Sequence, residues 1–250
     1  MPAFKNYIFK FAKLLERTAT AMQGKGYGAA TIEQEVKLVL QLLDLVPQLG
    51  VDIGGNVGNY TAELRRRYPS LEIHTFEPSA TNVQKLKARF GNDELVKLVP
   101  YAVSDAEGTA SLFANQPGSG LGSLTKRKLE HFNIDFSHQE TIQTVRFEDY
   151  WKDRLNKRRL DIVKIDIEGH ELNALNGFGT ALHQTRIVQF EFGGCNIDTH
   201  TYFQDFWYFF KDQNFDLFRI TPIGVQKIQR YAESEEFFAT TNYIAVNRRV

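Results

Sequence analysis

Three glycines fall within one short segment, Val51 to Gly58. The segment follows an apolar run and precedes a helical pattern, so Gly54, Gly55 and Gly58 occupy the turn between a strand and a helix. Glycines in such a turn let the backbone approach a ligand closely. A tight connection that binds nothing also needs glycines, so the role of the turn depends on the residues around it.

A carboxylate at the end of the next expected strand points to a nucleoside ligand. Glu77 follows Gly58 by 19 positions, the place from which a carboxylate accepts hydrogen bonds from both hydroxyls of an adenosine ribose. Pro78 and Ser79 then turn the chain into the following helix. The pattern predicts a site for an adenosine-containing cofactor.

Asn56 narrows the choice of cofactor. A dinucleotide fingerprint, Gly-x-Gly-x-x-Gly, leaves room for a pyrophosphate on the helix N-terminus, but Asn56 puts side-chain bulk there. The turn also lacks the Gly-Lys-Ser/Thr ending of a P-loop. S-adenosylmethionine, with a single carboxylate and ammonium at that end, suits the segment. We expect Asn56 to contact the amino-acid part of S-adenosylmethionine. We expect Asp52 to hold the loop or the ammonium, directly or through water.

A second acidic segment, Asp161 to Glu168, is expected to be a strand with its charges toward the C-terminal end. Ligands of open α/β sheets bind outside the carboxyl ends of the strands, so Asp166 and Glu168 should face the same crevice as the glycine turn. A lysine within a buried strand must be paired. We therefore expect Lys164 to lie alongside Asp166.

Four motifs, in their order along the chain, resemble those of the FkbM-type methyltransferases. They are Val51 to Tyr60, Phe76-Glu77-Pro78, Ala102-Val103-Ser104-Asp105 followed by Gly108, and Asp161 to Glu171. The resemblance spans about residues 49 to 247. It implies a class I methyltransferase fold that transfers a methyl group to a hydroxyl of a sugar, glycan or natural product. Gly55 is usually alanine in such proteins, a departure expected to cost little because both residues are small.

The turn, the ribose carboxylate and these motifs together give the residues expected to bind the cofactor. These are Asp52, Gly54, Gly55, Asn56, Gly58, Tyr60, Thr61, Glu77, Pro78, Ser79, Ala102 and Asp166.

Transfer of a methyl group requires the donor and acceptor to be aligned and a proton to be removed from the acceptor. Asp166 and Glu191 are the first candidates for the base, and His170, which titrates in the useful range, follows them. Asp166, Glu168 and Glu191 could instead assemble around Mg²⁺. No spaced metal motif is visible, so metal dependence stays open and no metal ligand is assigned.

Two other functions remain as alternatives. A NAD(P)-dependent oxidoreductase could use a similar sheet, but Asn56 and the lack of a Tyr-x-x-x-Lys pair oppose it. A non-catalytic nucleoside-binding protein could keep the site and bind another chain through its N-terminal helices.

The elements that must position these residues follow from the hydrophobic pattern. From Leu49 onward, short apolar runs alternate with helical stretches, which is typical of a parallel sheet covered on both faces. The sequence therefore predicts a Rossmann-like α/β domain over residues 49–250, with a mostly parallel seven-stranded sheet. Strands are expected near 49–53, 71–76, 96–100, 160–167 and 186–192, helices near 59–68, 79–90, 171–177 and 201–213, and a C-terminal antiparallel hairpin near 215–221 and 238–247.

An insertion at about 103–159 separates the third and fourth core strands. It contains strand-like runs at Ala110 to Ala114 and Thr141 to Phe147, and a Gly- and Ser-rich segment, Gln116 to Ser123. We interpret that segment as a lid that closes over the acceptor and excludes water. Ser119 and Ser123 would then contact acceptor hydroxyls.

Residues 1–48 form a predicted N-terminal helical extension. Apolar residues recur at helical spacing from Phe4 to Leu15 and again from Ile32 to Leu43, with a glycine-rich loop between the two helices. We expect the first helix to dock on its own domain. Because lysines flank its aromatic face, binding to a membrane surface or a partner is the alternative, including a homo-oligomer formed through these helices.

The composition limits the partners. Thirty Lys and Arg balance thirty Asp and Glu, so no global field gathers nucleic acid, and no nucleic-acid partner is expected. A single cysteine, Cys195, excludes an intrachain disulfide. No stretch approaches the roughly 18 apolar residues of a membrane span. We expect a cytoplasmic protein without a transmembrane segment that acts on a hydroxyl-bearing small molecule or glycan.

Overall fold

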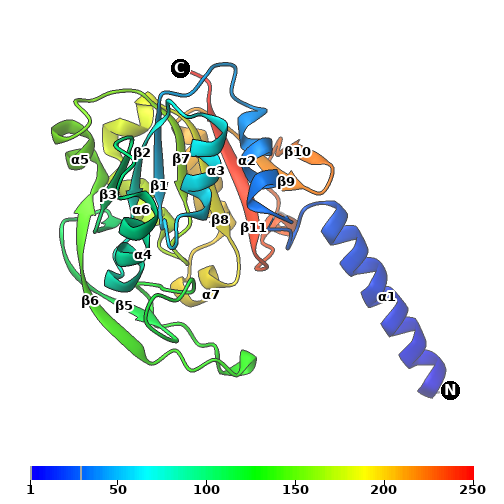
Figure 1. Cartoon of the computed structure of the whole chain (residues 1–250). Coiled ribbons are helices and arrows are strands. Elements are labelled where there is room, and N and C mark those ends of the chain that lie inside the picture. The colour runs from blue at the N-terminus through cyan, green and yellow to red at the C-terminus, as the bar shows by residue number, and fades with distance from the viewer. Residues whose placement is uncertain (1, 29) are drawn as a thin grey trace.

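An eight-stranded sheet forms the centre of the structure, a computed structural model that describes residues 2–28 and 30–250 (Figure 1). Its strands lie in the order β10-β9-β11-β8-β7-β1-β2-β3. Neighbouring strands from β8 to β3 are parallel, whereas β11 is antiparallel to both β8 and β9. The strands are β1 (Leu49–Ile53), β2 (Glu72–Phe76), β3 (Val96–Val99), β7 (Leu160–Ile165), β8 (Thr185–Phe192), β9 (Phe215–Thr221), β10 (Gly224–Lys227) and β11 (Thr241–Asn247).

This topology confirms the predicted Rossmann-like α/β fold with a mostly parallel sheet. The seven expected strands are present, and β9 and β11 are antiparallel neighbours as predicted for the C-terminal hairpin. The polar segment that joins them adds β10, which pairs with β9 at the edge of the sheet. A short strand with half-buried and exposed residues gives little hydrophobic pattern, so the sequence did not indicate it.

Helices cover both faces of the sheet. On one face, α2 (Ile32–Leu40) and α3 (Asn59–Arg67) pack in one apolar cluster with strand residues such as Ile73 and Ile162. On the other face, α5 (Phe147–Asp153), α6 (Glu171–Gly177) and α8 (Phe203–Asp212) surround β7 and β8. The alternation along β7 thus points Ile162 to one face and Val163 to the other. The remaining helices of the sheet domain are α4 (Ala80–Phe90) and α7 (Cys195–Thr199), with short 3₁₀ turns at Glu130–Phe132, Gly179–Gln184 and Glu233–Glu235.

The insertion forms a second, three-stranded sheet. Its strands β4 (Ala102–Ser104), β5 (Gly108–Ala114) and β6 (His138–Arg146) lie in the order β4-β6-β5, and β5 and β6 are antiparallel. The two strand-like runs expected in this region are therefore confirmed. The division of the chain at residue 48 remains a prediction.

The helix α1 (Pro2–Met22) extends away from the sheet (Figure 1). Tyr7 and Phe11, on its apolar face, are 71% and 62% exposed. The expectation that this helix docks on its own domain is wrong, because no part of the described body covers that face. The second helix, α2, docks as an amphipathic helix should, with Val36 and Val39 fully buried. Within residues 2–28 and 30–250, no helix has both the length and the apolar character needed to cross a membrane.

Candidate active site

Gly54 lies where the carboxyl ends of β1 and β7 meet. The chain continues from β1 to β2 on one side of the sheet and from β7 to β8 on the other, so the strand order reverses between β1 and β7. Open α/β sheets bind their ligands in the crevice at such a switch point. Gly54 has a φ of +85°, and a Cβ there would overlap the carbonyl oxygen of Asp166. Glycine is therefore needed for the two strand ends to approach each other.

Gly55 packs against Thr75 of β2. A Cβ on Gly55 would overlap the Thr75 methyl group, and the Thr75 hydroxyl is fixed by a 2.8 Å hydrogen bond to Thr61. Comparing residue sizes suggested that glycine and the family's usual alanine are nearly equivalent at this position. The packing contradicts that expectation, because the Thr75 side chain already occupies the space.

The larger of two cavities at this switch point encloses about 740 Å³, including the part that is open to solvent. Its walls come from the glycine turn, the end of β2, the segment after β7 and the insertion. Of the residues predicted from the sequence, Gly54, Asn56, Glu77, Pro78, Ser79, Ala102, Asp166 and His170 line it.

The smaller cavity lies on the other side of the glycine turn and encloses about 460 Å³. Gly54, Asn56 and Asp166 line both cavities, so the two spaces share a wall at the end of β7. The smaller cavity is also lined by Gly55 and Tyr60 from the predicted set and by Ile32, Glu35, Val57, Asn59 and Lys164.

Several predicted residues lie behind the cavity walls. Asp52 is fully buried, and its Oδ2 accepts a 2.7 Å hydrogen bond from the Thr61 hydroxyl. Gly58, with φ +79°, packs so closely on the ring of Phe90 that a Cβ would overlap it. Thr61 and Gly58 therefore shape the turn from behind. Glu191, at the end of β8, lines neither cavity.

Glu77 connects the end of β2 to the glycine turn. Its Oε2 accepts a hydrogen bond from the Asn56 amide at 2.8 Å, and its Oε1 accepts one from the Ser79 amide at 2.9 Å. Burial raises the pKa of Glu77, and the two amides oppose that rise. Each oxygen keeps a second lone pair. The carboxylate can therefore accept two further hydrogen bonds from a ligand in the larger cavity.

Lys164 lies among carboxylates at the wall of the smaller cavity. Its Nζ donates to Asp166 at 3.0 Å and lies 5.2 Å from the ring centre of Tyr60. Although burial alone would lower the pKa of this amine, the carboxylates of Asp166, Asp52 and Glu35 raise it above its usual value. The expected pairing of Lys164 with Asp166 is confirmed.

Glu35 and Asp52 are short of positive partners. Burial raises the pKa of both carboxyls, and Lys164 opposes the rise in each case. Asp52 Oδ1 is buried without a hydrogen-bond partner among the described residues. With Asp166 already paired to Lys164, the cluster has more carboxylates than cations. A positively charged ligand group in the smaller cavity would balance the cluster.

Sequence reasoning missed Glu35. This residue lies on the buried side of α2 beside Val36 and Val39, and only 8% of its surface is exposed. Its carboxylate accepts a hydrogen bond from Gln189 of β8, which in turn accepts one from the Tyr60 hydroxyl at 2.8 Å. The available signal was a carboxylate among the apolar positions of an amphipathic helix, because a charged residue is rarely buried there without a specific partner.

His170 precedes α6 and projects into the larger cavity. The Ser104 hydroxyl donates to Asp105 at 3.0 Å and lies 2.9 Å from His170 Nε2. A hydroxyl carries one proton, so Nε2–H donates to Ser104 and the lone pair is left on Nδ1. Burial lowers the pKa of His170, and Asp105 opposes the change. The network thus holds a neutral imidazole with one nitrogen free to accept a proton.

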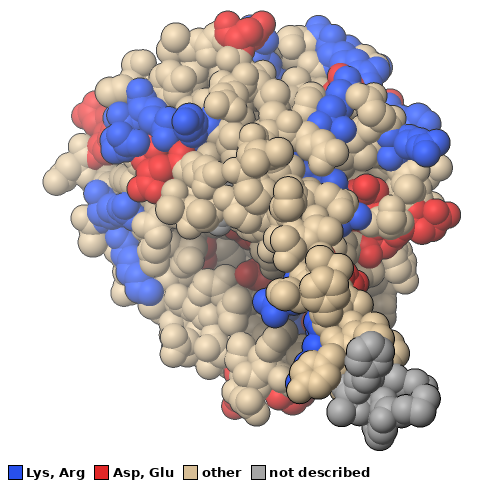
Figure 2. Space-filling model, turned by 90° about the vertical axis from the view of Figure 1, so that its right-hand side faces the viewer, with Lys and Arg blue, Asp and Glu red and all other residues tan. Residues whose placement is uncertain are grey.

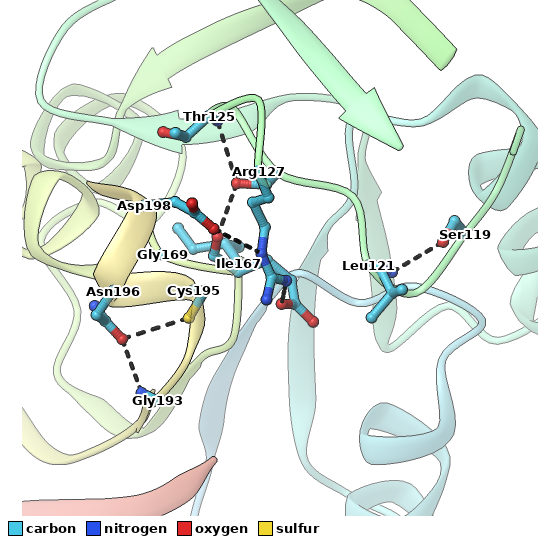
Figure 3. Close-up of polar contacts among 12 residues, drawn as sticks. Ser119, Leu121, Thr125, Arg127, Ile167, Gly169, Gly193, Cys195, Asn196 and Asp198 are labelled. Atoms are coloured by element: carbon cyan, nitrogen blue, oxygen red, sulfur yellow. Dashed lines mark hydrogen bonds and ion pairs between the residues drawn. The ribbon is translucent and has the colours of Figure 1, made fainter. Parts of the chain in front are cut away.

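An ion pair ties the insertion to the segment after β7 (Figure 3). Arg127 donates to Glu168, and its Nε lies 3.8 Å from Asp198. Burial raises the pKa of Glu168 to about 7, with Asp166 adding to the rise and Arg127 opposing it. Glu171 is fully buried and accepts hydrogen bonds from the amides of Ile167 and Gly169, so it fixes the same loop.

The Gly- and Ser-rich segment of the insertion lines the larger cavity through Gln116, Gly118, Ser119, Gly120 and Gly122. Ser123 does not share this position. It is only 1% exposed, and its hydroxyl donates to the backbone oxygen of Glu168 at 2.7 Å. The expectation that Ser123 contacts an acceptor is therefore wrong, because its hydroxyl anchors the segment. Ser119 lines the cavity and accepts a hydrogen bond from the Leu121 amide at 3.0 Å (Figure 3).

The acidic residues near β7 and β8 do not share one centre. Burial raises the pKa of Glu191 well above its usual value, with Asp166 and Glu168 adding to the rise. The charged form of this carboxyl is therefore disfavoured. Within the described residues, no three His, Cys, Asp or Glu side chains are arranged to hold one metal ion.

The sheet order, the antiparallel β11 and a crevice at the ends of β1 and β7 define a Rossmann-like class I methyltransferase fold. The sequence profile of the methyltransferase FkbM domain matches residues 52–217, more than half of the chain. The chain belongs to the FkbM methyltransferase domain family.

Individual relatives are distant. Methyltransferase sdnD of Sordaria araneosa is 31% identical over 152 residues, which cover 51% of this chain and 59% of the relative. The 2-O-methyltransferase NoeI of Sinorhizobium fredii (strain NBRC 101917 / NGR234) is 23% identical over 164 residues, covering 62% and 67%. A crystal structure of methyltransferase FkbM from Methylobacillus flagellatus KT is 15% identical with a TM-score of 0.49, covering 91% of this chain and 59% of that one. The chain therefore spans about three fifths to two thirds of the lengths of these relatives.

Proposed function

We propose that the protein is an S-adenosylmethionine-dependent O-methyltransferase that acts on a hydroxyl of a sugar, glycan or natural product. The observation that carries the proposal is the pair of cavities that share a wall at the glycine turn. The larger cavity contains the carboxylate of Glu77, which has free lone pairs. The smaller cavity borders the cluster of Glu35, Asp52 and Asp166, which has more carboxylates than cations. The larger suits the adenosine of this cofactor and the smaller suits its ammonium.

The residues fit the cofactor from one end to the other. In the larger cavity Glu77 would accept hydrogen bonds from the two ribose hydroxyls, with Pro78 and Ala102 beside the base. In the smaller cavity Glu35 and Asp166 would face the ammonium, and the buried Asp52 would add its charge from behind. The cofactor supplies a methyl group on a sulfonium that is already activated by its positive charge.

The chain's own residues then have to remove a proton from the acceptor. His170 suits this step best, because it lines the larger cavity and keeps an unprotonated Nδ1. Ser104 and Asp105 hold the ring in that tautomer. Asp166 lies between the two cavities and would position the donor beside the acceptor. Glu191, the other candidate, is disfavoured because its carboxyl lines neither cavity and its raised pKa disfavours the charged form.

The wall that the insertion contributes has the chemistry of an acceptor site. Leu112 and Leu124 are apolar, whereas Gln116, Ser119 and His138 add hydrogen-bonding groups. A mixed lining of this kind suits the carbon skeleton and hydroxyls of a sugar or a hydroxylated natural product. The relative NoeI is a 2-O-methyltransferase, which supports oxygen as the atom that receives the methyl group.

The cluster also weighs against a NAD(P)-dependent oxidoreductase. A pyrophosphate carries negative charge, and the smaller cavity already holds Glu35 and Asp166 beside Asp52. The negative charges of a pyrophosphate and of these carboxylates would repel each other. Membership of the FkbM methyltransferase domain family also favours a methyltransferase over an oxidoreductase.

The test is methyl transfer to a mixture of acceptors. Purified protein would be incubated with isotopically labelled S-adenosylmethionine and fractionated small-molecule and glycan extracts. We expect protein-dependent label in an acid-stable product, with one S-adenosylhomocysteine formed for each methyl group, and loss of both in His170→Ala. Binding of the cofactor without consumption in any fraction would instead indicate a non-catalytic nucleoside-binding protein.

A further inference from the structure

The helix α1 carries an unusual share of the exposed apolar surface. Seven of the fourteen exposed large apolar side chains found in the described part of the chain lie on this one helix. Tyr7 and Phe9 are each 71% exposed, and Leu14 is 60% exposed. Monomeric proteins rarely leave a large apolar patch exposed to solvent, and large exposed apolar patches mark sites of interaction.

Most of the exposed apolar residues of α1 form one face, and Phe9 lies on the opposite side of the helix. Tyr7, Ile8, Phe11, Leu14 and Leu15 recur at the helical spacing that places side chains on a common side. The charged residues lie off this face. From residue 6 to residue 22 they are the cations Lys10, Lys13 and Arg17 and the single carboxylate Glu16. The helix therefore combines a wide aromatic and aliphatic face with net positive flanks.

The base of α1 is anchored so that the helix points outward. Gly24, with φ +82°, packs against the backbone of Ile220, where a Cβ would overlap the carbonyl oxygen. The Gly26 amide donates to the Thr241 hydroxyl at 2.9 Å. These contacts fix the connecting loop to β9 and β11, and α1 extends from that edge of the sheet (Figure 1).

We propose that α1 binds the surface of an anionic membrane and holds the methyltransferase domain beside it. An amphipathic helix with a large apolar face and Lys and Arg flanks lies in the plane of the interface, with its apolar side among the acyl chains and its cations at the headgroups. None of the described helices is long and apolar enough to span the bilayer, so binding is at the surface. On the side from which α1 extends, basic and acidic side chains of the body are interspersed (Figure 2). The attraction is therefore local to the helix.

Charge decides between a membrane and a second copy of the chain. Paired helices gain specificity from acidic and basic residues that face each other across the seam. Each α1 offers one carboxylate, Glu16, against Lys10, Lys13 and Arg17, so two copies side by side bring more repulsion than attraction. Anionic headgroups complement all three cations.

The test measures binding of the whole protein to lipid vesicles by co-sedimentation. We expect binding to mixed phosphatidylcholine and phosphatidylglycerol vesicles, weaker binding at high salt, and much less binding to phosphatidylcholine alone. The double variant Lys10→Gln/Lys13→Gln should bind about 25-fold more weakly, at about fivefold for each cation lost near the surface. Phe11→Asp should abolish binding, because it puts a charge in the apolar face.

The control is Lys87→Gln/Lys97→Gln, which removes the same charge from exposed positions on the body and should bind as the unchanged protein does. Thermal unfolding of every variant checks that the body stays folded. Equal binding by Phe11→Asp and the unchanged protein would overturn the proposal. So would an absence of vesicle binding, and a concentration-dependent dimer that Phe11→Asp dissociates would then identify a second copy as the occupant.

Discussion

Replacing Glu35 with glutamine removes one negative charge from the wall of the smaller cavity and keeps the shape of the side chain. The amide oxygen of the glutamine can still accept the hydrogen bond from Gln189. Burial raises the pKa of Glu35, which means that the charged form is disfavoured in the protein without ligand. We therefore expect Glu35→Gln to leave the free energy of unfolding unchanged or slightly higher.

The effect on cofactor binding should be large and confined to one end of the ligand. A hydrogen bond to a charged group contributes about 1.5–3 kcal/mol, so loss of the carboxylate should weaken binding of an α-ammonium group about ten- to 150-fold. S-adenosylhomocysteine carries that ammonium. 5′-Methylthioadenosine has the same nucleoside and no amino-acid part, so its affinity should not change.

Calorimetric titration of both ligands into the unchanged protein and Glu35→Gln measures this difference. The matched control is Glu63→Gln, because Glu63 is also a buried carboxylate but pairs with Arg66 and Arg67 and lines neither cavity. The reasoning is refuted if Glu35→Gln binds S-adenosylhomocysteine normally, or if it loses affinity for both ligands equally. Either result would mean that Glu35 does not face the ammonium.

Three further outcomes follow from the site and its support. Glu77→Ala should weaken S-adenosylhomocysteine and 5′-methylthioadenosine alike, by about tenfold or more, because both carry the ribose; unchanged titrations would remove Glu77 from the ribose site. His170→Ala should lower kcat about 100-fold or more with the cofactor still bound, and the activity of the unchanged enzyme should fall only as the pH drops below about 6.5, since burial lowers the pKa of His170 from that value; a normal rate would exclude it as the base. The Thr180 hydroxyl and amide lower the pKa of Glu148 to about 2, so its stabilisation is complete above the pKa of the unfolded chain and disappears as the pH falls toward 2. Glu148→Gln should accordingly cost about 1–3 kcal/mol in urea unfolding at pH 7 and progressively less as the pH falls from 4.5 toward 2, and a pH-independent difference would contradict this.

The sheet and the main turns could be predicted because their signals are local. Buried strands such as β1 and β7 are short apolar runs, and the carboxylate of Glu77 stands at a fixed distance from the glycine turn. The family resemblance added the order of the motifs. These features required no knowledge of how distant segments pack.

The errors arose where distant segments meet. The need for glycine at position 55 depends on Thr75 in another strand, and the role of Ser123 depends on the backbone after β7. The contribution of Glu35 depends on α2 reaching the edge of the smaller cavity. Hydrophobic periodicity showed that α1 has an apolar face, but it could not show whether that face is covered.

Calorimetric titration of the unchanged protein with S-adenosylhomocysteine and, separately, with NADH and NADPH tests the central claim most directly. Glu77 in the larger cavity and the carboxylate cluster at the smaller one predict saturable binding of S-adenosylhomocysteine at one site per chain and none of either dinucleotide. Tight binding of NADH or NADPH with no binding of S-adenosylhomocysteine would contradict the account.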